Sequence, residues 1–393
     1  MIYRRFGKTG LQMPALSAGF MRSMHSWKNV PEADIPDVSQ SNIEAIVARA
    51  LELGINHFET ARGYGTSEQQ LGRVLQKITR DSFIVQTKVA PDNDPAVFKA
   101  NCLDSFNRLG LSKVDLLAIH GINDHRSFWQ VCRKGGCLQA ARDLQQKGRV
   151  GHVGFSGHGS CEIIQEALRH EEDGGFDYMN LHWYYIYQVN SPAIDEASKR
   201  DIGVFIISPT DKGGMMQKPP ERMIELCKPL SPMQFNDLYC LSHPGVQTIS
   251  VGASKPTDFD EHVQALEMKD QSAELILELD NLLLDVMERT TGYRRPEGIW
   301  STFPAWYATP GYVNIPNILW LYNLARGWDL IEYAKRQYQK LGDQVQWVPG
   351  NNAARAGEVD LESIAGTAGM EKGELVDVLK KAHDLLRKRN FRP

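Results

Sequence analysis

Residues 83–89 read Phe83-Ile-Val-Gln-Thr-Lys-Val89 and residues 114–120 read Val114-Asp-Leu-Leu-Ala-Ile-His120, with a helical stretch at 96–109 between them. Both runs are short and largely apolar, which is typical of buried strands. Strands that alternate with helices in this way form parallel sheets covered by helices. This stretch therefore predicts an α/β fold.

The same alternation continues on both sides of this stretch. Eight strand candidates lie within about 250 residues, which suits a closed (β/α)₈ TIM barrel better than an open sheet. No Gly-x-Gly-x-x-Gly follows the first strand, so a Rossmann fold is disfavoured. Residues 3–13 predict an N-terminal β-hairpin around Lys8-Thr9-Gly10. The strand candidates are 15–20, 57–60, 83–89, 114–120, 152–156, 178–183, 203–208 and 248–252.

The C-terminal hundred residues follow a different pattern. An amphipathic helix is indicated at 272–289, and 290–314 is rich in Gly, Pro and aromatic residues. Helical stretches at 316–341 and 372–389 follow. We predict two domains, a barrel over 1–290 and a mainly helical module over 291–393.

The composition excludes several classes of protein. The net charge is −4, and 42% of the residues are hydrophobic and 23% charged, so neither a nucleic-acid binder nor a disordered chain is indicated. The first residues lack an apolar leader, and no apolar run reaches the length of a membrane span. The six cysteines form no Cys-x-x-Cys pair. We expect a cytoplasmic protein without a membrane span, without nucleic-acid partners and without a metal site.

Four residues that carry chemistry fall at the ends of neighbouring strands. Glu59 lies at the end of the second strand and Tyr64 follows it, Lys88 lies at the end of the third strand and His120 at the end of the fourth. In a barrel these C-terminal ends form the catalytic face. A phenol with a pKa near 10 is a poor acid at neutral pH unless a cation stabilises its phenolate. Lys88 supplies such a cation, and Glu59 fixes Lys88.

The run Glu59-Thr-Ala-x-x-Tyr64-Gly-x-Ser-Glu-x-x-Leu-Gly72, followed by Thr87-Lys88 and His120, resembles the aldo-keto reductase signature. The resemblance covers residues 1 to about 270. It implies a (β/α)₈ barrel that binds NADPH at the strand ends and reduces a small-molecule carbonyl compound. It also implies that Tyr64 donates the proton, Lys88 lowers the pKa of Tyr64 and His120 orients the carbonyl. Glu59 stands where the family usually has Asp.

The resemblance implies a cofactor site as well. Ser156 and Asn180 match the residues that hold the nicotinamide carboxamide, although Gly157 replaces the usual Asn. Ser208 and Lys212 match the turn that faces the pyrophosphate. Asp258, where some members carry Arg, disfavours tight binding of a 2′-phosphate, so NADPH is expected and NADH stays open. The segment implied to bind the adenosine phosphate contributes Gly252, Ser254, Lys255 and Glu261.

The tail resembles a ferredoxin-like module found in some members of that family. Residues 312–329, together with Trp347-Val-Pro-Gly350, are similar to its helical scaffold. Relatives place four cluster-binding cysteines before this helix, and no residue at those positions here carries a thiol. We therefore expect no iron–sulfur cluster, and this module is a candidate surface for binding a protein partner. The positions concerned are Ile299, Thr302, Ala305 and Thr309.

Two functions stay open on the sequence. One is an NADPH-dependent reductase of aldehydes, ketones or quinones, with Tyr64 as proton donor. The other is a non-catalytic nucleotide-sensing or assembly protein that keeps the barrel without the reaction, as the departures at Glu59 and Gly157 allow.

Overall fold

The computed structural model describes residues 1–342 and 348–388. Trp347 and the predicted helix end at Arg389 lie outside these ranges. The chain divides into two compact units. The first comprises Met1–Tyr185, Val189–Gly213 and Met233–Ser272, and the second comprises Ile186–Gln188, Gly214–Pro232 and Ala273–Pro393.

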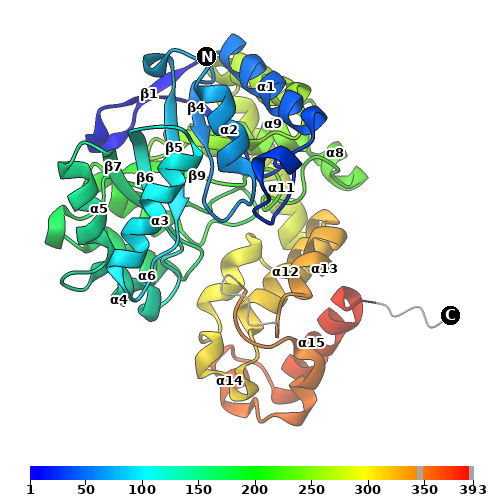
Figure 1. Cartoon of the computed structure of the whole chain (residues 1–393). Coiled ribbons are helices and arrows are strands. Elements are labelled where there is room, and N and C mark those ends of the chain that lie inside the picture. Colours follow the sequence, from blue (N-terminus) through cyan, green and yellow to red (C-terminus); the bar gives the residue numbers. More distant parts are fainter. Residues whose placement is uncertain (343–347, 389–393) are drawn as a thin grey trace. The chain divides into compact units, whose positions relative to one another are not determined.

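The first unit is built on a closed barrel of parallel strands in the order β10-β3-β4-β5-β6-β7-β8-β9 (Figure 1). The predicted (β/α)₈ barrel is thereby confirmed. Interior strand positions are almost all buried, which explains why the sequence shows short apolar runs instead of polar–apolar alternation. The strands are β3 Leu16–Gly19, β4 His57–Glu59, β5 Ile84–Val89, β6 Val114–His120, β7 Val150–Ser156, β8 Tyr178–Leu181, β9 Gly203–Ile206 and β10 Thr248–Gly252.

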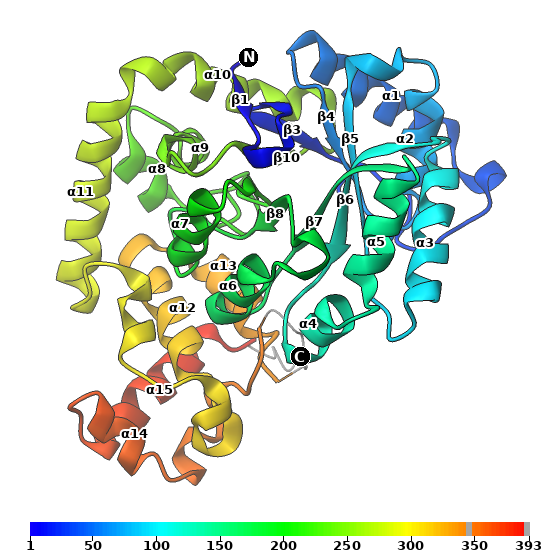
Figure 2. The ribbon, with the colours of Figure 1, turned by 90° about the vertical axis from the view of Figure 1, so that its left-hand side faces the viewer.

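Helices cover the outer face of this barrel (Figure 2). Two of these helices begin with a side-chain cap: Asp94 accepts a hydrogen bond from the Ala96 amide, and Asp124 forms a capping box with Ser127. The eight-residue α4 and the weakly amphipathic α9 were not indicated by the sequence, since neither has a long apolar period. The helices are α1 Asp37–Glu52, α2 Ser67–Leu75, α3 Pro95–Arg108, α4 His125–Cys132, α5 Cys137–Gln146, α6 Cys161–Arg169, α7 Ser191–Lys199, α9 Pro232–Ser242 and α10 Asp260–Met268.

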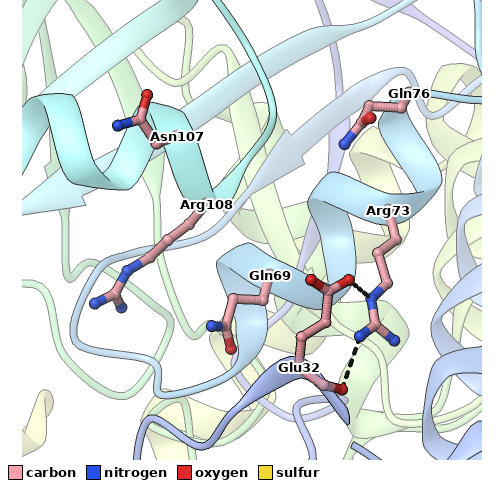
Figure 3. Close-up of a pocket in the computed structure, with 6 residues that line it drawn as sticks. All are labelled: Glu32, Gln69, Arg73, Gln76, Asn107 and Arg108. Carbon is pink, nitrogen blue, oxygen red and sulfur yellow. Dashed lines mark hydrogen bonds and ion pairs between the residues drawn. The ribbon is translucent and has the colours of Figure 1, made fainter.

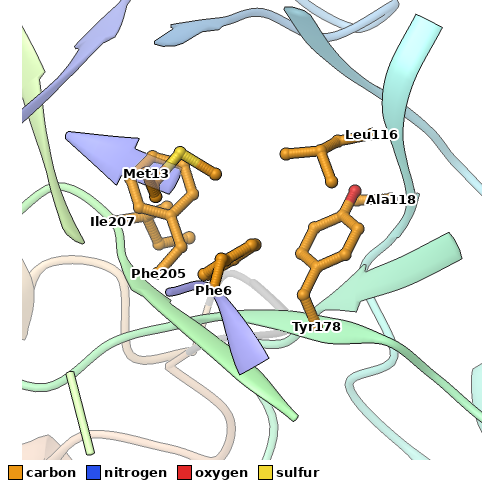
Figure 4. Close-up of a cluster of buried hydrophobic side chains, with 7 residues drawn as sticks. All are labelled: Phe6, Met13, Leu116, Ala118, Tyr178, Phe205 and Ile207. Atoms are coloured by element: carbon orange, nitrogen blue, oxygen red, sulfur yellow. The ribbon is translucent and has the colours of Figure 1, made fainter. Parts of the chain in front are cut away.

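The predicted N-terminal hairpin is confirmed as β1 Tyr3–Arg5 paired with β2 Gln12–Pro14. Its buried side chains Phe6 and Met13 pack against barrel residues of β6, β8 and β9 (Figure 4). The Phe6 and Tyr178 rings lie 5.6 Å apart. The hairpin thus buries apolar side chains of the barrel strands.

The second unit is mainly helical. Residues 316–341 form two helices, because Asp329 adopts a left-handed conformation with φ 59° and ends α12. Trp320 and Trp328 anchor α12 by indole hydrogen bonds of 3.0 Å to the carbonyls of Ile186 and Leu283. Helix α11 belongs to this unit, and the predicted domain boundary at residue 290 falls within the last turn of this helix. The helices are α8 Glu221–Cys227, α11 Ala273–Thr291, α12 Ile315–Trp328, α13 Ile331–Tyr338, α14 Glu362–Thr367 and α15 Lys372–Leu386.

Within residues 1–342 and 348–388, no helix combines the length and the apolar character needed to cross a bilayer.

Candidate active site

The four residues singled out at the strand ends come together on one face of the barrel. Glu59 is the last residue of β4, Lys88 is the penultimate residue of β5, and His120 ends β6. Tyr64 lies in the loop between β4 and α2. Parallel register brings the strand ends into line, with Glu59 opposite Gln86 and Lys88 opposite Ala118.

Glu59 and Lys88 form a buried ion pair. Lys88 is 1% exposed and Glu59 is 4% exposed, and the Lys88 ammonium also donates to the Thr60 carbonyl at 3.0 Å. Burial lowers the pKa of Lys88, because a charged amine loses its hydration. The Glu59 carboxylate is therefore the group that keeps the buried Lys88 amine charged.

Gly19 makes room for the glutamate in place of the shorter aspartate. A Cβ atom on residue 19 would lie 3.1 Å from Glu59 Oε2 and 2.7 Å from Ser250 Oγ. The second distance is shorter than any ordinary contact. The missing side chain on β3 thus accommodates the extra methylene on β4.

Tyr64 is held by its loop against Lys88 and His120. Gly65 has φ 49° and a Cβ there would lie 1.9 Å from the Ser26 carbonyl, so only glycine allows this close approach. The Lys88 ammonium lies over the Tyr64 ring, 4.9 Å from its centroid. The His120 ring is perpendicular to it at 6.0 Å. Burial raises the pKa of the Tyr64 phenol. That Lys88 lowers the pKa of Tyr64 therefore stays a proposal.

His120 is a neutral imidazole in this environment. Burial, together with smaller effects of the positive charges of Lys88 and Lys212, lowers its pKa to about 3. A neutral imidazole carries one donor and one acceptor nitrogen. His120 can therefore donate a hydrogen bond to a carbonyl oxygen without losing a proton.

Asn180 carries an unsatisfied amide inside the barrel. Ser156 and Asn180 are buried and lie opposite each other on β7 and β8. Ser156 Oγ accepts from the Gly121 amide at 3.2 Å, but neither Oδ1 nor Nδ2 of Asn180 has a hydrogen-bond partner in the described chain. Each such buried atom costs about 1–3 kcal/mol. A ligand carboxamide, which has one acceptor and two donors, would satisfy both atoms, so this site fits the expected nicotinamide.

The other predicted cofactor residues follow β9 and β10. Ser208 adopts φ 55°, and its carbonyl accepts from the Lys212 amide at 3.1 Å. Gly252 ends β10, and its carbonyl accepts from Arg22 at 2.8 Å. Lys255 precedes a short 3₁₀ helix, and Glu261 lies in the first turn of α10.

Asp258 takes up both donors of Ser254. Its carboxylate accepts from the Ser254 amide at 2.8 Å and from the Ser254 hydroxyl at 2.7 Å, and these hydrogen bonds outweigh burial and lower the pKa of Asp258. Arg22 lies 4.0 Å from the same carboxylate. Any anion at Ser254 must compete with Asp258.

Beyond the ends of β7, β8 and β9, the predicted residue Lys212 lies beside two histidines that the sequence did not single out as site residues, His158 and His182. The Lys212 ammonium lies 3.3 Å from His158 Nδ1 and 3.3 Å from His182 Nε2. These imidazoles contact each other, and His182 also contacts the Tyr184 hydroxyl. His158 and His182 each come two residues after the paired strand positions Ser156 and Asn180, and this spacing is the only sequence signal of the group.

A polar cavity of about 320 Å³ lies between α2 and α3 (Figure 3). The guanidinium of Arg73 contacts the side chain and the carbonyl of Glu32, and Arg108 pairs with Asp104 at 2.9 Å. The carboxylates of Glu32 and Asp104 therefore already neutralise Arg73 and Arg108, the cations that line this cavity. The lining residues are Glu32, Gln69, Arg73, Gln76, Asn107 and Arg108.

Comparison with known proteins gives a consistent picture. The sequence model described as the Aldo/keto reductase family matches residues 16–237. L-glyceraldehyde 3-phosphate reductase of Escherichia coli O157:H7 is 24% identical over 344 residues, covering 72% of this chain and 93% of that protein. L-galactose dehydrogenase of Arabidopsis thaliana is 26% identical over 320 residues, covering 73% and 96%.

Solved structures match the barrel. An aldo-keto reductase from Bacillus halodurans in its holo form has a TM-score of 0.58 at 23% identity, covering 71% of this chain and 96% of that one. An aldo-keto reductase from Klebsiella pneumoniae in complex with NADPH has a TM-score of 0.58 at 18% identity, covering 72% and 95%. At these identities the likeness concerns the fold.

Proposed function

This chain belongs to the aldo/keto reductase family, and from that premise we propose that it reduces a carbonyl group with a nicotinamide dinucleotide, using Tyr64 as the proton donor. The observation that carries the proposal is the convergence of Tyr64, Lys88 and His120 beside the buried carboxylate of Glu59. One phenol, one cation and one neutral imidazole suffice to bind and protonate a carbonyl oxygen.

The roles follow from the chemistry of each group. A substrate oxygen held by the Tyr64 hydroxyl and the neutral His120 is polarised before it accepts the proton. As the proton leaves, the phenolate forms beside the Lys88 ammonium, which stabilises it. Glu59 keeps Lys88 charged and in place. The bound dinucleotide would supply the hydride to the carbonyl carbon.

The cofactor proposed is NADPH, as in the Klebsiella relative, held at the nicotinamide by Ser156 and Asn180. Ser208, Lys212, Gly252, Ser254, Lys255 and Glu261 are proposed for the rest of the dinucleotide. Asp258 already accepts both hydrogen bonds that Ser254 can donate, so a 2′-phosphate should add little to the binding energy of the dinucleotide. NADH therefore stays an alternative source of the hydride.

For residues 291–393 we propose a ferredoxin-like module that binds no cluster. Ile299, Thr302, Ala305 and Thr309 have no thiolate, and the described residues hold no group of three or more histidines, cysteines or acidic residues suited to a metal ion. Tyr307 and Tyr312 are exposed aromatic side chains of this module, and they support a role in binding a protein partner.

A non-catalytic nucleotide-sensing protein is the second candidate. It is favoured by the raised pKa of the Tyr64 phenol, which opposes proton donation unless bound ligands change its surroundings.

The two candidates are separated by Tyr64→Phe, with the exposed Tyr307→Phe as matched control. We expect Tyr64→Phe to lower NADPH-linked reduction of a panel of aldehydes and quinones about 10²- to 10⁴-fold, while tryptophan-fluorescence titration shows unchanged NADPH binding. Unchanged reduction in Tyr64→Phe would refute the role of Tyr64. Binding of NADPH by the wild-type protein without any turnover would favour the sensor.

A further inference from the structure

Trp27 lies beside the proposed proton donor and keeps most of its side chain exposed. It belongs to the loop between β3 and α1, and its ring meets the Tyr64 ring edge to face, with the two centroids 6.3 Å apart. Trp27 is 63% exposed, and Tyr64 is half-buried. We propose that the indole of Trp27 binds an aromatic ring of the carbonyl substrate, which makes the proposed site selective for aromatic aldehydes and ketones.

The residues before Trp27 are fastened to the turn that carries the proposed proton donor. The Ser26 carbonyl accepts a hydrogen bond from the Thr66 amide at 3.0 Å. The His25 amide donates to Gln70 Oε1 at 2.8 Å, and the Ser26 amide donates to Thr66 Oγ1 at 3.2 Å. The backbone that leads into Trp27 is therefore held in a fixed position relative to this turn.

The residues after Trp27 are held by two helices. Arg108 of α3 donates to Asn29 Oδ1 at 2.9 Å, and Arg73 of α2 donates to the Glu32 carbonyl at 2.8 Å. The loop is thus anchored on both sides of Trp27, while the indole itself stays exposed. A binding group that is already in place loses less conformational entropy when a ligand arrives.

The order of the strands assigns the indole to the substrate. Ser156, proposed for the nicotinamide, ends β7, and three strands separate β3 from β7 on either side of the closed barrel. The loop of Trp27 therefore follows the strand opposite β7, whereas Tyr64 follows β4, the neighbour of β3. A carbonyl compound that binds between the nicotinamide and Tyr64 has Trp27 on the side away from the nicotinamide.

An aromatic substituent suits this position for two reasons. An apolar ring gains free energy when it covers the exposed indole and water leaves both surfaces. Two aromatic rings with centroids about 4.5–7 Å apart gain a further electrostatic attraction, which a saturated ring lacks. Tyr64 already forms such pairs with Trp27 and, at 6.0 Å, with His120. An aromatic aldehyde whose oxygen contacts Tyr64 would add one more ring to this series.

The inference rests on the proposed carbonyl reduction and is tested with Trp27→Ala, Trp27→Phe and, as matched control on the same loop, the exposed Lys28→Ala. The substrates are benzaldehyde, cyclohexanecarbaldehyde of nearly the same size, and propanal. We expect Trp27→Ala to raise KM for benzaldehyde about tenfold, with a smaller rise for cyclohexanecarbaldehyde and about twofold or less for propanal. Trp27→Phe should keep most of the preference, and Lys28→Ala should behave as the wild type.

Two results would overturn the inference. A fall in kcat of similar size for all three aldehydes in Trp27→Ala, with KM unchanged, would show that Trp27 only positions Tyr64. An unchanged KM for benzaldehyde together with an unchanged kcat would show that the indole does not contact the substrate. Thermal unfolding of each variant confirms that the comparison is made between folded proteins.

The aromatic site and the proposed reduction can fail separately. If the wild-type protein reduces none of the three aldehydes, calorimetric titration with benzamide in the presence of NADPH decides, because benzamide keeps the ring and the carbonyl group but is not reduced. Binding that Trp27→Ala weakens, and that cyclohexanecarboxamide does not reproduce, keeps the aromatic site while the proposed reduction fails. Absence of binding, or equal binding by Trp27→Ala, removes the aromatic site as well.

Discussion

At the scale of single residues, Glu59 is the departure from the expected aspartate that most directly bears on the proposed reaction. The structure accommodates its longer side chain through the glycine at position 19, where a Cβ would lie 3.1 Å from Glu59 Oε2. We predict that Gly19→Ala displaces Glu59 and Lys88 and lowers kcat on the order of a hundredfold, as a displacement of about 1 Å can. Gly366→Ala, which meets open space, is the control for the added methyl.

Steady-state kinetics and thermal unfolding separate the effects of Gly19→Ala on activity and on stability. A folded variant with unchanged kcat would show that the Glu59–Lys88 geometry does not matter for turnover.

The buried histidines lead to a prediction about the stability of the fold at acid pH. Burial lowers the pKa of His57 to about 3, with a smaller effect of Lys88, and its Nδ1 contacts Ser17 Oγ at 2.7 Å. Because the unfolded chain binds this proton near pH 6.5 and the folded one does not, the free energy of unfolding falls as the pH drops from about 6.5 to 3. His120 adds to the same slope.

Urea unfolding of His57→Gln between pH 4 and 7 measures this contribution, and we expect a shallower slope than in the wild type. The exposed His125→Gln should keep the wild-type slope. Identical slopes in all three proteins would mean that His57 is protonated in the folded state.

The residues of the proposed site were predictable to different degrees. Glu59, Lys88 and His120 could be assigned to one face because parallel strands place their C-terminal ends together. The ring-face approach of Lys88 to Tyr64 depends on side-chain rotamers and was not predictable. The cluster around Lys212 was missed as a unit, since its members come from three separate loops.

At the scale of elements, a buried pair joins two helices on the outside of the barrel. His262 of α10 contacts Asp237 of α9. Burial opposes the charged imidazole, but Asp237 outweighs it and raises the pKa of His262. A raised pKa stabilises the fold below about pH 6.5, and this contribution is lost as the pH rises through the folded-state value.

We predict that Asp237→Asn lowers the free energy of unfolding by on the order of 3 kcal/mol at pH 6, because it leaves a buried imidazole without its counter-charge. The deficit should shrink at higher pH, where the wild-type pair also loses its charge. Chemical unfolding at pH 6 and pH 9 measures both values, with the exposed Asp81→Asn as control. A deficit that grows with pH would contradict the charged pair.

Helix boundaries show where sequence patterns fall short. The apolar period from 316 to 341 runs through Asp329, whose left-handed conformation ends α12. Asp tolerates this conformation without being required for it, so the break carries no clear sequence signal. The strands of the barrel, in contrast, were predictable, because buried apolar runs separated by helices leave little other choice.

At the scale of the whole molecule, the chain combines a barrel unit and a helical unit that differ in their chemistry. All six cysteines lie between residues 102 and 240, and those positions are buried in the described structure. Burial raises the pKa of each thiol, for instance to about 12 at Cys132 and Cys227, which disfavours the thiolate that iron requires. The resemblance of the tail to a ferredoxin-like module therefore predicts a scaffold without its electron carrier.

The expected lack of an iron–sulfur cluster leads to a prediction about how electrons reach the barrel. We expect anaerobic reconstitution with iron and sulfide to leave far less than one cluster per chain, with no absorbance band near 400 nm, because none of Ile299, Thr302, Ala305 and Thr309 offers a thiolate. Stoichiometric acid-labile sulfide would contradict it and would imply ligands from the barrel cysteines.

If no cluster forms, a one-electron donor such as reduced viologen should drive no carbonyl reduction while NADPH does, since the proposed site then accepts electrons only as a hydride.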